Sequence, residues 1–425
     1  MQNKYKLLIK VPTKASIEIL TNYFLIVYAF LLPVSTHYSK TIFIFILIGF
    51  LFTSNFQKKV IDVLRNRLVQ AFLLFYLIHF LWFFGSDNLL IAKFKILDFR
   101  YILYIIIFAT VIKEQYKEKI LNGFIFGILF SEIVSYLMFF NILPDYITVK
   151  AYSTNVPFMQ SYTQYAVILS LSLGLMIYKI INGNTSIITK TLYSFFFLSA
   201  STNIFIIDSK LGYGLYSISI LTVILFIFRK KISKKIIFFT FLLIGTTYIL
   251  AYSNSSIVKS KVYSIKHGLV NAYEKQEYQG SVGLRIGWWI YSYDVFKNNI
   301  LFGVGTGDHL DEVKKIVDLD TKNKAALSVA LTSGGNGSLH SEYLDNLIQF
   351  GLIGLFVFLN IFYSIYKTSS TNSTIELLKY LLLIIFLTNS TVSLIFIHST
   401  LGKIFILLSA LLVSQQKKNS CSSYN

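Results

Sequence analysis

The chain has 425 residues, of which 55% are hydrophobic and only 14% charged, and it contains 39 Phe and 29 Tyr. This balance excludes an ordinary soluble protein. The formal net charge of +19 is a value that nucleic-acid-binding proteins also reach, but here the lysines gather in short loops between apolar runs. That pattern orients a membrane protein. A single cysteine, Cys421, excludes an internal disulfide.

Apolar runs of roughly 18 to 25 residues recur along the whole chain, and each is long enough to cross about 30 Å of hydrocarbon. Inside a bilayer every backbone N–H and C=O must be bonded within its own segment, so these runs are expected to be helices. The prediction is an all-α polytopic membrane protein with about twelve transmembrane helices. They are expected at residues 17–34, 41–54, 68–84, 96–112, 120–143, 164–181, 187–207, 211–228, 236–252, 342–366, 376–397 and 400–413.

The basic loops predict the orientation of the chain. Segments 57–67, 113–119 and 229–235 are rich in Lys and Arg and are therefore assigned to the cytoplasm, together with both termini. The first apolar run follows four lysines and lacks a small-residue cleavage pattern, so it is expected to stay as an anchor. The same alternation places the long polar segment outside, in the periplasm of a bacterium with two membranes, and the protein itself in the inner membrane.

Three parts of one integrated bundle follow from this arrangement. Residues 1–252 are expected to hold nine transmembrane helices, residues 253–341 a periplasmic loop domain with short amphipathic helices, and residues 342–425 the last three helices and a cytoplasmic tail.

Within the loop domain, residues 283–296 have a helical pattern with paired tryptophans, which is typical of a helix that rests on the membrane surface. Its Arg285 carries a guanidinium, which can hold two phosphate oxygens in a planar fork. The alternative is a scaffold helix whose Arg285 only meets lipid headgroups. Downstream, the glycine-rich residues 301–308 lack the Lys-Ser/Thr ending of a P-loop, so we expect a tight turn in which the backbone approaches a neighbour closely.

His340 closes the polar segment. If Ser338 caps the following helix, His340 lies in its first turn, where the positive end of the helix disfavours imidazolium. A neutral imidazole at the outer edge of the membrane can act as general base for a sugar hydroxyl. An interfacial histidine that only forms hydrogen bonds is the alternative.

Three features together resemble the O-antigen ligase family, which includes related O-antigen polymerases. They are Arg285 on an aromatic helix, the turn Leu301-Phe-Gly-Val-Gly-Thr-Gly307, and the motif that begins His340-Ser-Glu-Tyr-Leu and ends Gly-Leu-Ile-Gly-Leu355. The resemblance implies a glycosyltransferase of lipopolysaccharide biosynthesis that needs no cofactor, nucleotide sugar or metal. Its donor is a glycan on undecaprenyl diphosphate, and its acceptor in the ligases is a sugar of the lipid A core.

The resemblance also implies roles for single residues. Arg285 and a second arginine at a helix start hold the diphosphate, while His340 activates the acceptor hydroxyl, which attacks the anomeric carbon with inversion. The chain departs from this pattern at the second position, where Asp208-Ser-Lys-Leu-Gly212 places Lys210. Lysine keeps the charge but loses the bidentate fork, and Lys210 could equally be an ordinary snorkelling residue at a helix end. Arg100, near the outer end of the helix at 96–112, is a candidate third phosphate contact because charges at membrane depth are costly.

Two further functions are weighed against the ligase. A polymerase of O-antigen or capsular repeat units uses the same lipid-linked donor and differs only in its acceptor. A polysaccharide or lipid transporter needs charges deep in several helices and paired broken helices, whereas this chain concentrates its polar residues in the outer segment. No partnership with nucleic acid is expected.

Overall fold

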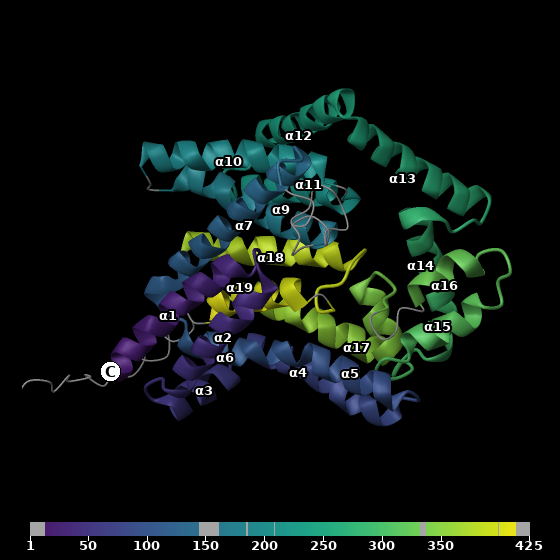
Figure 1. Cartoon of the computed structure of the whole chain (residues 1–425), viewed down its shortest axis with the longest axis horizontal. Coiled ribbons are helices and arrows are strands. Elements are labelled where there is room, and N and C mark those ends of the chain that lie inside the picture. The colour runs from purple at the N-terminus through teal and green to yellow at the C-terminus, as the bar shows by residue number, and fades with distance from the viewer. Residues whose placement is uncertain are drawn as a thin grey trace, which may run out of the picture.

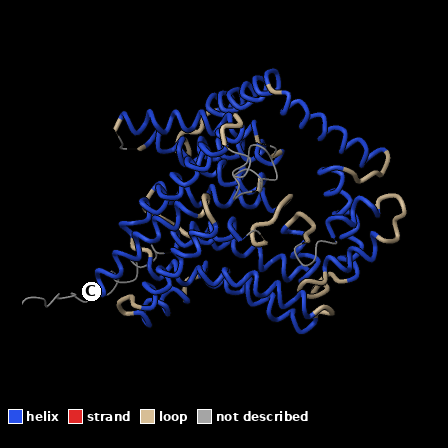
Figure 2. The backbone as a smooth tube through the Cα atoms, in the orientation of Figure 1, coloured by secondary structure: helices blue, strands red, loops and turns tan. Residues whose placement is uncertain are grey.

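The computed structural model of the chain describes residues 13–143, 161–183, 186–207, 209–331, 337–397 and 399–413. Within these ranges the backbone forms helices and loops and contains no strand (Figure 2). The all-α prediction is therefore confirmed for the part of the chain that is described. Cys421 and Asp208 lie outside it.

The first part of the chain consists of α-helices joined by tight turns and short 3₁₀-helices. Many of the α-helices begin at a Ser, Thr or Asn whose side chain accepts a hydrogen bond from the first turn, as Ser209 does from the N–H of Gly212. In chain order the helices are α1 (Lys14–Leu31), α2 (Thr36–Leu51), α3 (Phe56–Leu64), α4 (Arg67–Leu81), η1 (Trp82–Gly85), α5 (Leu89–Phe99), η2 (Arg100–Leu103), α6 (Tyr104–Val111), η3 (Glu114–Tyr116), α7 (Lys117–Phe139), α9 (Tyr162–Asn182), α10 (Ile187–Ile206), α11 (Lys210–Ile227) and α12 (Lys234–Asn254).

The second part supplies a group of shorter helices and three that return to the bundle. These are α13 (Ser256–Glu274), α14 (Gly280–Asn298), α15 (His309–Val317), α16 (Lys324–Leu331), α17 (Glu342–Lys367), α18 (Ser373–Ser390) and α19 (Ser399–Val413). Figure 1 shows α13 to α16 gathered at one end of the molecule, beside the start of α17, with α3 at the opposite end.

Two separate hydrophobic cores hold this arrangement. The larger one is built from the long helices of the bundle and includes Phe72, Phe124 and Phe386. The smaller one joins α13 to α16 to the beginning of α17 and includes Trp288 and Leu344. The helices of the polar segment therefore pack on one another and on α17. The division at residues 252 and 341 stays a prediction.

The twelve predicted membrane-spanning helices are confirmed only in part. Among the described residues, eight helices are long and apolar enough to cross a bilayer, or nine if α2 and α3, which meet at an angle of 109°, form one broken span. The eight are Lys14–Leu31, Arg67–Gly85, Glu114–Phe139, Tyr162–Asn182, Lys210–Ile227, Lys234–Asn254, Glu342–Lys367 and Ser373–Ser390. The helix α19 is apolar but shorter. A count of twelve is thus not confirmed.

Two of the expected helices differ in their course. The helix predicted at 96–112 is interrupted by the 3₁₀-helix η2, and its first part starts earlier, at Leu89. This stretch carries four charged residues within two turns, and Lys95 among them is buried, so polar packing competes with a regular apolar helix. The helix predicted at 376–397 ends at Ser390, and residues 391–397 form a non-helical segment that we call the strap.

The glycine-rich turn contacts a kink in α17, which begins where Gly351 has a φ of 64°. The N–H of Val304 bonds to the carbonyl of Ile348 (3.0 Å), and that of Leu352 to the carbonyl of Ile300 (2.8 Å). A Cβ on Gly351 would lie 2.3 Å from the carbonyl carbon of Leu301, so only glycine allows this approach. The expected close approach of the turn to a neighbouring backbone is confirmed.

Candidate functional site

A groove lies where α13 and α14 pass over the starts of α9 and α11. Its volume is about 950 Å³, and its lining combines cations with apolar side chains. The lining includes Tyr162, Lys210, Lys261, Leu269, Arg285 and Trp289. A cavity of this size, mostly apolar with a few polar groups at one place, has the character of a ligand site.

Two predicted site residues, Lys210 and Arg285, come together in this groove. The Nζ of Lys210 donates a hydrogen bond to the hydroxyl of Ser281 (2.8 Å), and a terminal nitrogen of Arg285 donates to the carbonyl of the same serine (2.6 Å). Lys210 is the first residue of α11, whereas Ser281 and Arg285 lie one turn apart on α14. The packing of α14 over the start of α11 thus brings two positive charges to one serine.

The orientation of Arg285 depends on the strap as well. Its Nε donates to the carbonyl of Val392 (3.2 Å), and Val392 also lines the groove. Burial lowers the pKa of the Arg285 guanidinium, while the nearby phenol of Tyr162 opposes this shift. An arginine nevertheless stays charged in proteins near neutral pH. The groove therefore holds a fixed cation at its polar end.

His340 contacts α14 at Trp288, one turn after Arg285. Its ring stacks on the buried indole of Trp288, with ring centroids 4.9 Å apart and an angle of 18° between the planes. Trp288 follows Arg285 by three residues, so the two share a face of the helix. The other parts of the His340 side chain are exposed. The imidazole is thus held by one face and open to a partner on the other.

The predicted position of His340 in the first turn of α17 is wrong. The helix begins at Glu342, and its N-cap is Ser341, whose hydroxyl accepts from the N–H of Leu344. His340 precedes the cap and has a φ of 52°, which a non-glycine residue rarely adopts. The chain accepts this conformation because buried neighbours fix it on both sides: the N–H of Leu339 bonds to Asp345, and the hydroxyl of Ser341 to the carbonyl of Ser390.

The protonation of His340 follows from its surroundings. Partial desolvation by the surrounding protein atoms lowers the pKa of His340, and the positive charge of Arg285 lowers it further, while Asp345 opposes the shift. The direction agrees with the expected neutral imidazole. Its cause is different, because desolvation and Arg285 replace the helix end as the main influences.

Glu342 connects the His340 motif to the strap. Its carboxylate accepts from the N–H of Ile395 (2.6 Å), and its own N–H bonds to the carbonyl of Ser393 (3.3 Å). The strap in turn carries the carbonyl of Val392 that orients Arg285. Behind it lies a buried polar group of Lys95, Asp345 and His309, in which His309 Nε2 is 3.7 Å from a carboxylate oxygen of Asp345.

Arg100, the remaining predicted site residue, does not line the groove. It lies exposed in η2, where its guanidinium donates to the carbonyl of Leu97 (2.8 Å). Its charge interacts electrostatically with Tyr104 and Lys403, neither of which lines the groove. The structure therefore brings Lys210 and Arg285 together in the groove and places His340 close enough to feel the charge of Arg285, but outside the groove lining. Arg100 lies elsewhere. Among the described residues, no group of three or more His, Cys, Asp and Glu is arranged to hold a metal ion.

Sequence reasoning missed Ser281, Trp288 and Glu342. Two of them had a local signal: Ser281 and Trp288 stand four residues before and three residues after Arg285, which places all three on one helical face. Glu342 had none, since its partner Ile395 was assigned to a helix.

Residues 195–359 match the family model described as O-Antigen ligase. This match supports membership of the O-antigen ligase family. A protein of Haemophilus influenzae described as uncharacterized is 29% identical over 157 residues, which is 35% of this chain and 37% of that protein. The match to this relative thus spans just over a third of its length.

The region matched to the O-antigen ligase family begins within α10 and ends within α17. It contains Lys210, Arg285 and His340 together with the glycine-rich turn, and it excludes Arg100. This match and the apolar helices point to a bacterial membrane protein.

Proposed function

We propose that the protein is an O-antigen ligase, which transfers a glycan from undecaprenyl diphosphate to a sugar of the lipid A core. The single observation that supports this best is the meeting of Lys210 and Arg285 in one groove, with His340 stacked on Trp288, one turn of α14 after Arg285. A lipid diphosphate carries two phosphates and an apolar tail, and the groove offers cations at one end and apolar side chains along its length.

The diphosphate binds at the two cations. The guanidinium of Arg285 already donates to Ser281 and Val392, which fix its direction, and it keeps further N–H groups for phosphate oxygens. Lys210 adds a second positive charge at Ser281. When the glycosidic bond breaks, negative charge develops on the departing diphosphate, and fixed cations near a low-dielectric region stabilise that charge. Arg100 does not line the groove, so its predicted phosphate contact stays a prediction.

The polyprenyl tail lies along the apolar part of the groove. Leu269 of α13 and Trp289 and Ile290 of α14 line it, and both helices leave apolar side chains exposed near it. Such a groove suits a chain that must stay in the membrane while its headgroup reaches the polar end.

His340 takes the proton of the acceptor hydroxyl. Its imidazole is neutral at neutral pH because its pKa is lowered, and one face is open while Trp288 holds the other. The hydroxyl oxygen then forms a bond to the anomeric carbon as the bond to the diphosphate breaks, which inverts the configuration. The proton passes to the imidazole and the electron pair of the broken bond leaves with the diphosphate. No nucleotide or metal enters this scheme.

The site is proposed to face the periplasm, with both termini in the cytoplasm of a cell that keeps the protein in its inner membrane. The direct test is transfer by the purified protein in detergent, given lipid-linked glycan and lipid A core, with chelator present and no nucleotide. We expect glycan on lipid A core. A product in which repeat units grow on the lipid carrier instead would identify a polymerase, and no product of either kind would overturn the proposal.

A further inference from the structure

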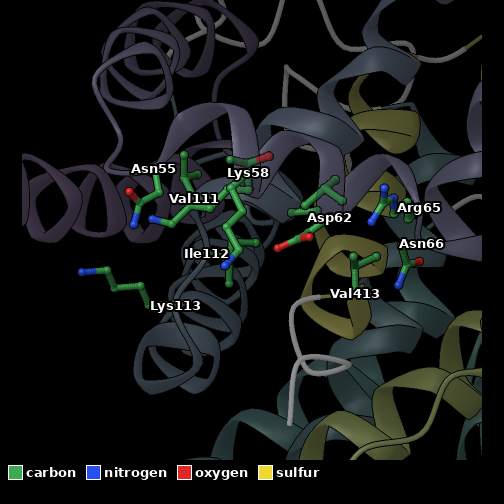
Figure 3. Close-up of a pocket in the computed structure, with 13 residues that line it drawn as sticks. Asn55, Lys58, Asp62, Arg65, Asn66, Val111, Ile112, Lys113 and Val413 are labelled. Carbon is green, nitrogen blue, oxygen red and sulfur yellow. The ribbon is translucent and has the colours of Figure 1, made fainter. Parts of the chain in front are cut away.

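A second cavity lies at the opposite end of the molecule from α13 to α16, between α3 and the turn that follows α6 (Figures 1 and 3). Its volume is about 720 Å³. We call it the basic pocket. Four cationic side chains and one carboxylate line it, namely Lys58, Lys59, Arg65, Lys113 and Asp62.

We propose that the basic pocket binds the phosphate-bearing headgroup of an anionic membrane lipid. The proposal concerns a site separate from the groove and does not depend on the transfer reaction.

Buried polar contacts build the basic pocket, so it is more than a group of surface lysines. Glu18 of α1 holds Lys59 and Lys113, each with an N–O distance of 2.8 Å. The fully buried amide of Asn22, one turn further along α1, bonds to the carbonyl of Val111 (3.0 Å) and accepts from the N–H of Lys113 (3.1 Å). The wall that carries Lys113 is therefore fixed to α1.

The net charge of the pocket lining favours an anionic ligand. Glu18 and Asp62 supply two carboxylates against the four cations of the lining, so a net positive charge remains. Asp62 stands four residues after Lys58 and three before Arg65 on α3, which puts these side chains on one helical face. Figure 3 shows Lys58, Asp62 and Arg65 along α3, with Val111 and Ile112 across the same space. A phosphate with oxygens in several directions can contact more than one of these cations at once.

The position of α3 favours a lipid as the source of the phosphate. The helix α3 turns by 109° from the end of α2, so it crosses the end of the bundle. Beside its basic face, α3 exposes Ile61 and Leu64, at 48% and 36% of their surface. A short helix that exposes basic and apolar residues together is typical of the membrane interface. Lipid headgroups lie at that depth, and basic pockets at helix ends bind anionic ones.

The volume of the pocket agrees with this assignment. Pockets that hold small organic ligands measure about 300–1,000 Å³, so the cavity has room for a glycerophosphate headgroup rather than for a phosphate ion alone.

The test uses the full-length protein in detergent and measures binding of phosphatidylglycerol, phosphatidylcholine and inorganic phosphate by native mass spectrometry. The pocket variant is Lys58→Gln/Arg65→Gln, in which two exposed side chains are changed. The matched control is Lys230→Gln/Lys231→Gln, which removes the same charge from exposed positions outside the pocket. Unchanged melting temperatures of both variants show that they fold.

We expect phosphatidylglycerol to bind the wild type more tightly than phosphatidylcholine does, and the pocket variant to bind it about tenfold more weakly, as expected for loss of charge-assisted contacts. The control variant should bind as the wild type does. Equal binding by the pocket variant and the wild type would overturn the site. Binding of inorganic phosphate that phosphatidylglycerol does not displace would overturn the lipid as its ligand.

Discussion

Lys210 and Arg285, which come from two helices far apart in the sequence, donate hydrogen bonds to the same residue, Ser281. Two like charges near one serine repel each other, and an anion bound beside them would offset that repulsion. The arrangement therefore supports the proposed diphosphate site.

The first prediction concerns the fork of Arg285. Replacing Arg285 with Lys keeps the charge but removes the planar donors, so kcat/KM for transfer should fall at least about tenfold, and Arg285→Ala should lower it further. A control on the same helix is Lys297→Ala, since Lys297 is paired with Asp294 at the exposed surface. Full transfer by Arg285→Ala, or an equal loss in the control, would show that Arg285 has no special part.

The second prediction is a gain at the position where the chain departs from its family. Lys210→Arg should transfer at least as well as the wild type, because a guanidinium at the start of α11 can contact the phosphate with two donors. Lys210→Gln should lower kcat/KM by about tenfold. If Lys210→Gln transfers normally while its melting temperature is unchanged, Lys210 is a snorkelling residue and the diphosphate lies elsewhere.

A third prediction concerns pH. A general base must be neutral, and the pKa of His340 is lowered from 6.5 by burial and by Arg285. We therefore expect kcat/KM to be constant above pH 6.5 and to fall only below it, as His340 takes up a proton. The same shift makes the unfolded chain the stronger proton acceptor, so stability from His340 is present above pH 6.5 and is lost as the pH falls. An acid limb centred above 6.5, or transfer by His340→Ala, would contradict the role.

A fourth prediction separates Glu342 from the residues that touch substrate. Glu342 is a positioning residue, because its carboxylate holds the N–H of Ile395 and so fixes the strap that orients Arg285. Glu342→Ala should lower kcat/KM and, by leaving buried N–H groups unpaired, cost about 1–3 kcal/mol of stability. Glu342→Gln keeps an acceptor oxygen and should restore most of the activity without changing the pH profile. If Glu342→Gln instead removes the acid limb, Glu342 takes part in proton transfer itself.

The kink of α17 gives the last substitution. Gly351→Ala places a Cβ 2.3 Å from backbone atoms of Leu301 at a φ of 64°, so we expect a lower melting temperature from a loss of about 1–3 kcal/mol or more. Gly245→Ala in α12 is the matched control, because nothing lies within 4 Å of its Cβ position and alanine favours a helix. Equal melting temperatures for the two variants would show that the contact between the glycine-rich turn and the kink of α17 does not contribute to the stability of the fold.

The sequence predicted much of this fold, because apolar runs are sufficient to identify buried and lipid-facing helices. A polar residue inside such a run is bonded between helices, since the carboxyl of Glu132 on α7 accepts from the hydroxyl of Ser199 on α10. The break at η2 was harder, since Lys95 is buried and interacts with Asp345 and Glu342, which are remote in sequence.

The candidate site was predictable in its residue types and not in its geometry. The sequence motifs identified Arg285, His340 and Lys210 as candidate site residues. Nothing in the local sequence indicates that α14 lies over the start of α11. The conformation of His340 was hidden for another reason. A positive φ is expected of glycine or asparagine. Histidine adopts it here because the N–H of Leu339 is held by the carboxylate of Asp345 and the hydroxyl of Ser341 donates to the backbone carbonyl of Ser390.

The most direct measurement compares donor binding with transfer in three purified proteins: wild type, Lys210→Gln/Arg285→Gln and His340→Ala. Binding of an undecaprenyl-diphosphate glycan and its transfer to lipid A core are recorded on the same samples. We expect His340→Ala to bind the donor as the wild type does and to transfer no glycan. Lys210→Gln/Arg285→Gln should bind the donor at least about tenfold more weakly than the wild type. Wild-type donor binding by the double variant, or transfer by His340→Ala, would contradict this expectation.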